Sequence, residues 1–324
     1  MTNINEGDQA FRSDSLKGRD LEMPFGGALS FLRRKYTREI DSADIVVSGI
    51  PFDMATSNRP GARFGPRALR VASVGLAELD AYPFGFDPFD FVAVADYGDC
   101  YIDYGYPQNA TELIERHADQ IINTDSMMVS MGGDHYVTYP LLKAHAKKFG
   151  PLSLIHFDAH CDTWPDDGNR QDHGSMFLRA VREEIVDPTT SVQIGIRTHN
   201  QDTFGFTVLG APWVHREGIP AVIEVIRETV GNRPAYLTFD IDCLDPAFAP
   251  GTGTPVAGGL SSAQALEAIR SLGEFEIVGM DLMEVAPQYD VGEITAIAGA
   301  TILHDFICLQ AVKAGATPLP FGRV

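Results

Sequence analysis

The sequence predicts an α/β protein with a central, mostly parallel sheet. Short apolar runs of strand length alternate with longer amphipathic segments, which is the pattern of repeated βαβ units. Three of the apolar runs end in carboxylates and imidazoles, at 134–135, 158–162 and 240–242. If these runs are neighbouring parallel strands, their carboxyl ends lie side by side, where open α/β sheets bind their ligands. We therefore expect one functional site at one edge of the sheet.

The predicted strands are short and rich in β-branched residues, and amphipathic periodicity predicts helices between them. The strands span, in order, 43–50, 91–95, 127–131, 154–157, 192–196, 236–239 and 276–282, and 213–215 fits a further short strand. The first predicted helix begins at Pro66. The other predicted helices span 111–123, 139–149, 221–230, 262–272 and 294–312. Turn-rich loops at 53–67, 163–176 and 245–255 leave the predicted site edge and should border the site.

Length and composition favour one large domain. The chain has 324 residues, of which 44% are hydrophobic, enough to bury a single large core. Residues 1–40 are polar and rich in glycine and charge, and we interpret them as an N-terminal arm that packs on the domain or on a neighbouring subunit. Residues 41–324 contain no repeat or linker-like stretch, so we expect them to form one domain.

The formal net charge of −19 argues against a nucleic-acid partner, which would need a basic patch. It suits a small cationic substrate through long-range attraction, although acidity that serves solubility alone explains it equally well. The N-terminus lacks a basic region followed by an apolar run, and no stretch approaches the ~20 uninterrupted apolar residues of a membrane span. The four cysteines show no CxxC spacing, so neither a disulfide framework nor a zinc ribbon is indicated. We expect a cytoplasmic protein with no membrane partner.

The stretch after Leu154 has the spacing of a metal-ligand comb. In an extended chain alternate side chains point to the same side, so Asp158, His160 and Asp162 should converge while Cys161 faces away. Together with the other two strand ends this gives about four negative charges in a partly dry crevice, which is unfavourable without cations. Two divalent ions would balance them, with Mn²⁺ as first choice and Zn²⁺ or Fe²⁺ as second. The candidate ligands are His135, Asp158, His160, Asp162, Asp240 and Asp242.

Other titratable residues have simpler interpretations. A single Asp-x-His at a strand end is usually a surface feature, but six ligand-type residues at three strand ends favour a metal site. His156 lies deeper than the comb and is interpreted as a core histidine or a support for a ligand, and not as a ligand itself. Asp134 and Asp245 are interpreted as turn residues or as supports for a ligand. Spacing alone also allows His173 to be an ordinary histidine before a glycine turn, and Glu284 a surface carboxylate.

Five motifs together resemble those of one family. They are Gly-Gly-Asp-His at 132–135, Asp-Ala-His-Cys-Asp at 158–162, His-Gly-Ser-Met-Phe at 173–177, Thr-Phe-Asp-Ile-Asp-Cys-Leu-Asp-Pro at 238–246 and Met-Glu-Val-Ala-Pro at 283–287. In order and spacing, from about residue 25 to about residue 314, they resemble the ureohydrolases, the arginase and agmatinase family, and most closely its bacterial agmatinase branch. The resemblance implies a three-layer α/β/α arginase-like fold, a binuclear manganese site with two Mn²⁺ per subunit, and homo-oligomers of three or six subunits.

The resemblance also assigns roles to the residues at the matching positions. Asp158 and Asp240 would bridge the two ions, His135 and Asp162 would complete the first site, and His160 and Asp242 the second. His173 matches the proton-shuttling histidine of the family. Glu284 matches its guanidinium-binding glutamate. The implied reaction is the hydrolysis of a guanidino compound, most simply agmatine, to urea and an amine. Two departures, Cys161 and Ser175 where threonine is more usual, leave the expected chemistry unchanged.

Several alternatives stay open at this point. Four other enzymes share the implied fold: guanidinobutyrase, guanidinopropionase, guanidine hydrolase and formimidoylglutamase. A substrate with an anionic tail would require an arginine in the pocket, and the candidates are Arg59, Arg63 and Arg197. The arginines of the 53–67 loop could equally bind carbonyls or a partner subunit. Arginase itself is disfavoured, because the asparagine and serine that hold an α-amino acid are not matched in 163–172. A zinc deacetylase would need a His-His pair, which the chain lacks. A non-catalytic metal-binding paralogue is the remaining possibility.

Overall fold

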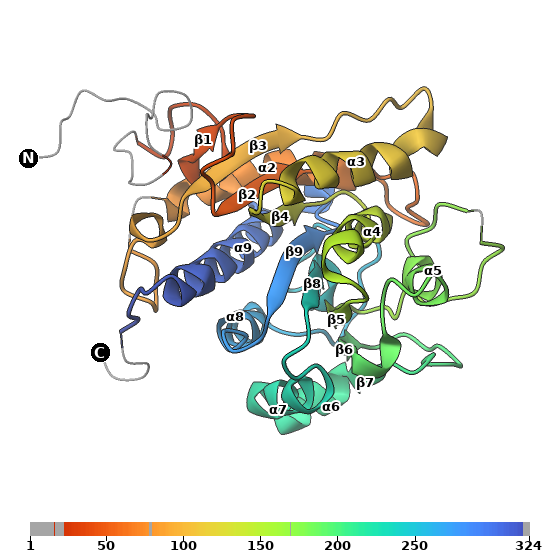
Figure 1. Cartoon of the computed structure of the whole chain (residues 1–324). Coiled ribbons are helices and arrows are strands. Elements are labelled where there is room, and N and C mark those ends of the chain that lie inside the picture. Colours follow the sequence, from red (N-terminus) through yellow and green to blue (C-terminus); the bar gives the residue numbers. More distant parts are fainter. Residues whose placement is uncertain (1–15, 17–22, 78–79, 169, 320–324) are drawn as a thin grey trace, which may run out of the picture.

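A computed structural model describes residues 16, 23–77, 80–168 and 170–319. This part of the chain contains one sheet of nine parallel strands in the order β1-β3-β2-β4-β9-β8-β5-β6-β7 (Figure 1). The strands are β1 (Lys35–Tyr36), β2 (Ile45–Gly49), β3 (Val94–Asp99), β4 (Met127–Met131), β5 (Ser153–Phe157), β6 (Val192–Ile196), β7 (Thr207–Gly210), β8 (Ala235–Asp240) and β9 (Ile277–Met283).

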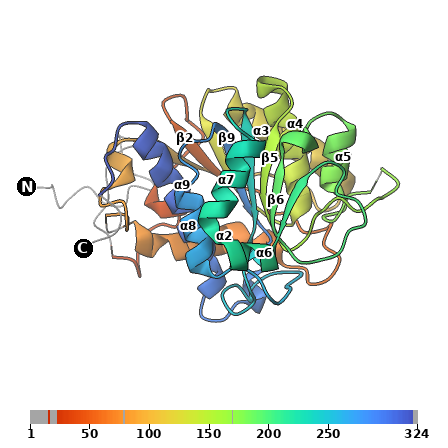
Figure 2. The same cartoon turned by 90° about the horizontal axis from the view of Figure 1, so that it is seen from below.

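Helices cover both faces of the sheet (Figure 1 and Figure 2). One layer consists of α3 (Ala110–Ile122), α4 (Thr138–Phe149) and α5 (Met176–Arg182), which contact one another in sequence. The other consists of α2 (Gly65–Ser73), α9 (Ile294–Lys313), α8 (Ser262–Arg270), α7 (Ile219–Thr229) and α6 (Ala211–Glu217), again in contact order. The predicted three-layer α/β/α arrangement is therefore confirmed.

Each face of the sheet has its own hydrophobic core, which explains the near-continuous apolar runs of the strands. In β2, Ile45 and Val47 join the core under α2 and α9, whereas Val46 between them joins the core under α3 and α4. Both faces of a parallel strand are buried when helices cover both sides, so alternation of polar and apolar residues is lost. The polar residues that matter are consequently found at the strand ends.

Two element predictions were wrong and three elements were missed. Residues 213–215 lie in helix α6 rather than in a strand. The second predicted strand, 91–95, is displaced to β3 at Val94–Asp99. Strands β1 and β7 are short edge strands and α5 is a short helix, and none of them was predicted. Short elements bury few residues, so their periodicity is hard to distinguish from that of loops.

The strand order also corrects the assumption that the three motif strands are immediate neighbours. Strands β5 and β8 are paired directly, but β9 lies between β8 and β4. Because β9 is inserted there, the residue that follows it, Glu284, is brought into the predicted site. The sheet thus delivers four strand ends to the site instead of three.

The N-terminal arm and the last helix both contribute to the domain. Residues 1–15 and 17–22 of the predicted arm lie outside the described residues, but Phe31 and Leu32 are fully buried in the core and β1 pairs with β3. Helix α9 has the length and hydropathy of a membrane span, yet 72% of that window is buried inside the fold. It packs against α2 and α8, and its Asp305 accepts a hydrogen bond from Arg270 of α8 at 2.7 Å. Its apolar character is that of a core helix.

Candidate active site

Four of the predicted ligands gather around one imidazole nitrogen. His135 begins the 3₁₀ helix His135–Val137 after β4, Asp158 follows β5, and Asp240 is the last residue of β8. Nδ1 of His135 lies 3.0 Å from Oδ2 of Asp158, 3.1 Å from Oδ2 of Asp162 and 3.2 Å from Oδ2 of Asp240. All four residues are buried. The strand ends therefore bring one imidazole and three carboxylates to a single point.

A second cluster adjoins the first and shares Asp158. Nδ1 of His160 lies 3.3 Å from Oδ1 of Asp158 and 3.1 Å from Oδ2 of Asp242. Asp158 thus directs one oxygen to each cluster. Asp240 does not: its Oδ2 faces His135, while its Oδ1 accepts a hydrogen bond from the backbone N–H of Asp242 at 2.8 Å. The bridging role of Asp158 has a geometric basis here, whereas that of Asp240 rests on the resemblance alone.

The expected extended comb is not formed, although its side chains converge. Residues 158–162 leave β5 as a turn, in which the backbone N–H of His160 donates to Oδ1 of Asp158 at 2.6 Å. Asp162 has a positive φ of 51°, a left-handed conformation that L-residues seldom adopt. A turn therefore brings the three side chains together where strand alternation was expected to do so. Cys161 is buried away from the cluster, as predicted, with its sulfur accepting from Asn200 Nδ2 at 3.1 Å.

A chain of buried hydroxyls fixes the tautomer of His135. Asp281 of β9 accepts hydrogen bonds from the hydroxyls of Thr138 and Thr238, at 2.9 and 2.6 Å. Because the Thr238 hydroxyl donates its proton to Asp281, its oxygen accepts from Nε2–H of His135, at 2.8 Å. The lone pair of His135 then lies on Nδ1, which has no hydrogen-bond partner and faces three carboxylates. Three anionic oxygens at this distance from the lone pair are stabilised by a positive charge between them, either a bound metal ion or a proton on Nδ1.

His156 supports the ligand Asp158 by a hydrogen bond, as Thr238 supports His135. Its Nε2 lies 2.7 Å from Oδ2 of Asp158, and its Nδ1 lies 3.2 Å from Nε2 of Gln193, which also donates to the carbonyl of Cys161 at 2.6 Å. Since the Gln193 amide nitrogen can only donate, His156 carries its proton on Nε2 and donates it to Asp158. His156 is close enough to be counted with the ligand atoms. Its hydrogen bonds make it a support for Asp158.

The charge balance of the cluster favours bound cations. Burial, together with the neighbouring carboxylates, raises the pKa of Asp162 to about 7 and raises the pKa values of Asp240 and Asp242 above the ordinary value. Burial alone would lower the pKa of His160 and His135, but the surrounding carboxylates raise that of His160 to about 12 and that of His135 well above its usual range. The site attracts positive charge, and its imidazole and carboxylate donors are those of a divalent ion such as Mn²⁺. The residues therefore fit a binuclear metal cofactor.

His173 and Glu284 form a pair at the side of the two clusters. Nδ1 of His173 lies 2.8 Å from Oε1 of Glu284, which also accepts from the backbone N–H of His135 at 2.9 Å. Oε2 of Glu284 is buried and has no hydrogen-bond partner. Glu284 has a φ of 65°, a conformation that costs a residue other than glycine about 1–3 kcal/mol and is typical of functional sites. A buried carboxylate oxygen without a donor is suited to receive one from a ligand.

Two contacts favour opposite protonation states of His173. Burial lowers the pKa of its imidazole, but the Glu284 carboxylate outweighs this and raises the pKa to about 9. The backbone N–H of Ser57, which can only donate, points at Nε2 of His173 at 3.0 Å and favours a lone pair there. The Ser57 hydroxyl lies 2.7 Å from the same nitrogen. A ring held between these two contacts is suited to gain and lose a proton at Nε2.

A cleft of about 320 Å³ opens onto both clusters and onto His173. The loop that supplies Ser57 is fastened to the site by Asp134, whose Oδ2 accepts from the backbone N–H of Ala55 at 2.8 Å. The other side of the cleft is formed by the loop that follows Asp162, which contributes residues between Trp164 and Gly174. The lining residues are Ser57, His160, Asp162, Trp164, Asp172, His173, Gly174, Asp240 and Thr254.

Comparison with known proteins agrees with this geometry. The family model described as the Arginase family matches residues 43–308. The chain belongs to the arginase family. A relative from Chromobacterium violaceum, named agmatinase, is 57% identical over 309 residues, covering 95% of this chain and 96% of the relative. An agmatinase of Neisseria meningitidis serogroup A is 53% identical over 272 residues, covering 84% of this chain and 88% of the relative.

Solved structures of the arginase family superpose closely on this chain. A protein of Burkholderia thailandensis, described as a hypothetical agmatinase, is 58% identical with a TM-score of 0.94, covering 95% of this chain and 98% of that one. The proclavaminate amidino hydrolase of Streptomyces clavuligerus is 38% identical with a TM-score of 0.86, covering 90% and 99%. The predicted arginase-like fold and the resemblance to agmatinases are confirmed. This member of the arginase family is an amidinohydrolase.

In this arginase-family enzyme, the three arginines considered for an anionic substrate have other roles. Arg197 donates to backbone carbonyls, among them those of Asp242 at 2.6 Å and Val256 at 2.7 Å, and so fastens the segment after β8. Arg63 forms an ion pair with the buried Asp53 at 2.5 Å. The guanidinium of Arg59 lies 5.3 Å from the ring centroid of Tyr289. None of the three lines the described cleft.

Sequence reasoning missed several residues that support the site. Thr238 could have been found, because it lies two residues before Asp240 on the same strand. Asp281 is a carboxylate in an otherwise apolar strand, which is a signal of a buried polar role. Ser57 and Gln193 carry no local signal, since their positions follow from loop and strand neighbours that are distant in sequence.

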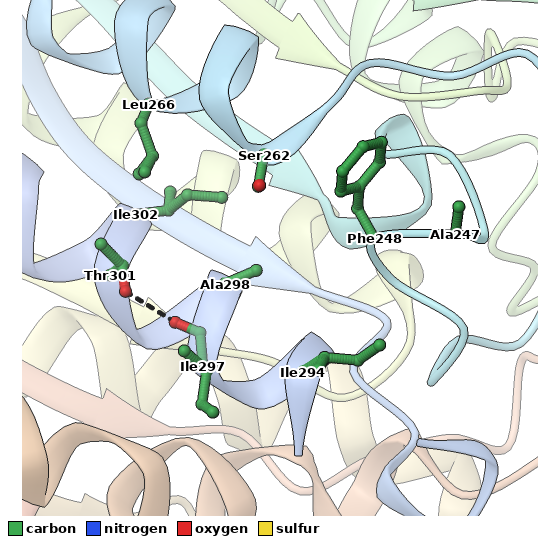
Figure 3. Close-up of a pocket in the computed structure, with 9 residues that line it drawn as sticks. All are labelled: Ala247, Phe248, Ser262, Leu266, Ile294, Ile297, Ala298, Thr301 and Ile302. Carbon is green, nitrogen blue, oxygen red and sulfur yellow. Dashed lines mark hydrogen bonds between the residues drawn. The ribbon is translucent and has the colours of Figure 1, made fainter. Parts of the chain in front are cut away.

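A separate hollow lies on the α8 and α9 side of the molecule (Figure 3). It has a volume of about 310 Å³ and is bordered by Phe248, Leu266 and Ile297, among others. Figure 3 shows apolar side chains and the hydroxyls of Ser262 and Thr301 around it. Its lining in the described chain contains no ionisable residue, so it offers no group for acid–base or metal chemistry.

Proposed function

We propose that the enzyme hydrolyses agmatine to putrescine and urea at a binuclear manganese centre. The observation that carries this proposal is the pair of carboxylate and imidazole clusters that share Asp158, next to the unpartnered Oε2 of Glu284. Relatives named agmatinase at 50–57% identity support the substrate.

The two clusters supply the ligands of the proposed centre. One ion would be held by His135, Asp158, Asp162 and Asp240. The other would be held by His160 and Asp242 together with Asp158 and Asp240, which the two ions would share. Bound divalent ions lower the pKa of water and so supply a hydroxide nucleophile near neutral pH. The support of His135 by Thr238 and of Asp158 by His156 keeps these two side chains in the orientation that ligation requires.

Glu284 is proposed to bind and orient the guanidinium. Its Oε1 is already occupied by His173 and the backbone of His135, whereas Oε2 is free to accept an N–H of the substrate. A charge-assisted hydrogen bond from guanidinium to carboxylate would orient the planar group beside the two ligand clusters. His173 would then deliver a proton from Nε2 to the departing amine, because its raised pKa keeps the imidazolium available at neutral pH.

The rest of the cleft favours a cationic tail. Apart from the proposed metal ligands Asp162 and Asp240, its described lining contains Asp172, which also pairs with Arg170 at 3.0 Å, and the aromatic face of Trp164, and no lysine or arginine. Carboxylates and aromatic faces both attract ammonium groups. A carboxylate tail, as in guanidinobutyrate or guanidinopropionate, would find no lysine or arginine partner among these residues, and the imidazolium of His173 is already paired with Glu284. This supports agmatine over the anionic alternatives.

The test is urea release by the purified protein after loading with Mn²⁺. Agmatine, guanidinobutyrate, guanidinopropionate, arginine and free guanidine are compared in parallel. We expect a strong preference for agmatine. A preference for an anionic guanidino acid would keep the metal chemistry and overturn the substrate, and urea from none of the five would leave formimidoyl substrates or a non-catalytic role. Assembly as a homo-oligomer of three or six subunits and a cytoplasmic location stay predictions, for sedimentation and cell fractionation to test.

A further inference from the structure

A second hollow adjoins the active-site cleft, and the two share Trp164. This side hollow has a volume of about 430 Å³ and lies between residues 164–165 and the loop 199–204. The cleft itself measures about 320 Å³. Trp164 is the residue common to the two linings. Trp164 therefore lies between the catalytic cleft and a neighbouring space of comparable size, and we take its indole as the partition between them.

Trp164 is held through its own backbone and through the preceding residue, Thr163. Its backbone N–H donates to the carbonyl of Gly174 at 3.0 Å, and a Cβ at Gly174 would lie only 3.3 Å from the indole Cε3. The indole thus packs against a backbone that has no side chain to displace it. On the other side, Asn200 of the side hollow donates to the hydroxyl of Thr163 at 2.8 Å. The ring of His160 lies 6.1 Å from the indole, which places the partition beside the second ligand cluster.

The side hollow has the chemistry of a cation-binding pocket. Its polar lining comes from His199, Asn200, Gln201 and Asp202, and Phe204 adds an aromatic face. No lysine or arginine belongs to its lining in the described chain. Asp202 is exposed, and its Oδ1 accepts from the backbone N–H of Phe204 at 2.7 Å, which leaves the other carboxylate oxygen available. An ammonium group would find both a carboxylate and amide acceptors there.

We propose that Trp164 determines substrate specificity by limiting the length of the cationic tail to what the cleft alone can hold. When the indole is removed, the side hollow becomes a subsite for the ammonium end of a longer guanidinoalkylamine. This inference rests on the proposed function, because it assumes that the guanidinium is held at Glu284 and that the tail extends along the cleft toward Trp164.

The test compares Trp164→Ala with Trp164→Phe in the Mn²⁺-loaded enzyme. The substrates are agmatine and a homologue whose alkyl chain is about twice as long. In Trp164→Ala, we expect the ratio of kcat/KM for the long substrate to that for agmatine to rise about tenfold or more, mainly through a lower KM for the long substrate. Trp164→Phe retains an aromatic partition and should keep the wild-type ratio. Adding Asp202→Asn to Trp164→Ala should reverse part of the gain.

Metal content and melting temperature identify variants that fail for structural reasons, and Trp164→Leu replaces Trp164→Ala if the latter does not fold. An unchanged ratio in a folded, metal-loaded Trp164→Ala or Trp164→Leu would overturn the inference, and so would an equal rise in Trp164→Phe. Failure of the proposed function would be recognised by a different result: the wild-type enzyme would release no urea from agmatine. In that case calorimetric binding of the same two compounds to wild type and variants decides the role of Trp164.

Discussion

The active site has two parts that are built differently. Its floor consists of the six candidate ligands at the ends of β4, β5 and β8, and its rim consists of the loops that carry Ser57, Trp164 and His173. In the floor, the carboxylates are held by backbone N–H groups, as in Asp158 with His160 and Asp240 with Asp242. In the rim, residues of separate loops contact one another, as the hydroxyl and the backbone N–H of Ser57 contact Nε2 of His173.

This difference predicts separate phenotypes. Backbone hydrogen bonds at strand ends are as rigid as the sheet, so the floor can hold ions at fixed positions. Loops can be replaced or shifted without disturbing the sheet, so the rim can set proton transfer and substrate choice. Substitutions in the floor should remove metal, whereas substitutions in the rim should alter turnover while metal stays bound.

The largest effect is expected for Asp158→Ala in the floor. Asp158 directs one oxygen to each ligand cluster, so its loss should remove both ions and abolish urea release. Metal analysis of the purified variant checks this, with the exposed Asp90→Ala as a control for loss of a carboxylate elsewhere. A full metal complement in Asp158→Ala would disprove the shared position of Asp158.

His173→Asn tests the rim. Removing the proposed proton donor should lower kcat by about 10²-fold or more, the usual contribution of general acid catalysis. Metal content should remain that of the wild type, because His173 contacts Glu284 and Ser57 and none of the ligands by hydrogen bond. Loss of metal together with activity would place His173 in the floor and remove the distinction drawn above.

The pH dependence of kcat is a second test of the role of His173. The pKa of His173 is raised to about 9, so the protonated ring is the dominant form at neutral pH and is lost as pH rises through that value. If the protonated ring donates to the leaving amine, kcat should decline above about pH 9. The decline should be absent from the residual activity of His173→Asn. A wild-type rate that stays level through this range would argue for a different proton donor.

A smaller effect is expected beneath the floor, for Thr238→Val. The change removes the hydroxyl that accepts from Nε2–H of His135 and donates to Asp281. Loss of such a supporting hydrogen bond typically weakens metal affinity by about 10–100-fold. Titration with Mn²⁺ measures it. Thr138→Val is the matched control, because it removes a hydrogen bond to the same Asp281 without touching His135. Equal affinity loss in both variants would indicate a general packing defect.

The contrast between floor and rim also explains what the sequence could predict. The candidate ligands were identifiable because apolar strands end in carboxylates and imidazoles, and parallel strands place such ends together. The presence of Glu284 beside the ligand clusters required β9 to lie between β8 and β4, which no local pattern encodes. The turn at 158–162 was mistaken for extended chain, since the same residues converge in either geometry. Ser57 was invisible because it is 116 residues from His173, its partner.

The smallest effect is expected for Ser57→Ala, which divides the rim contact into its two components. The variant removes the hydroxyl at 2.7 Å from Nε2 of His173 but keeps the backbone N–H at 3.0 Å. One hydrogen bond of this kind contributes about 0.5–1.5 kcal/mol, so kcat should fall by about two- to tenfold with metal content unchanged. Steady-state kinetics and metal analysis on the same preparation measure both. A fall as large as that of His173→Asn, with metal retained, would mean that the Ser57 hydroxyl carries the proton between His173 and the substrate, and the rim would then contain a two-residue relay.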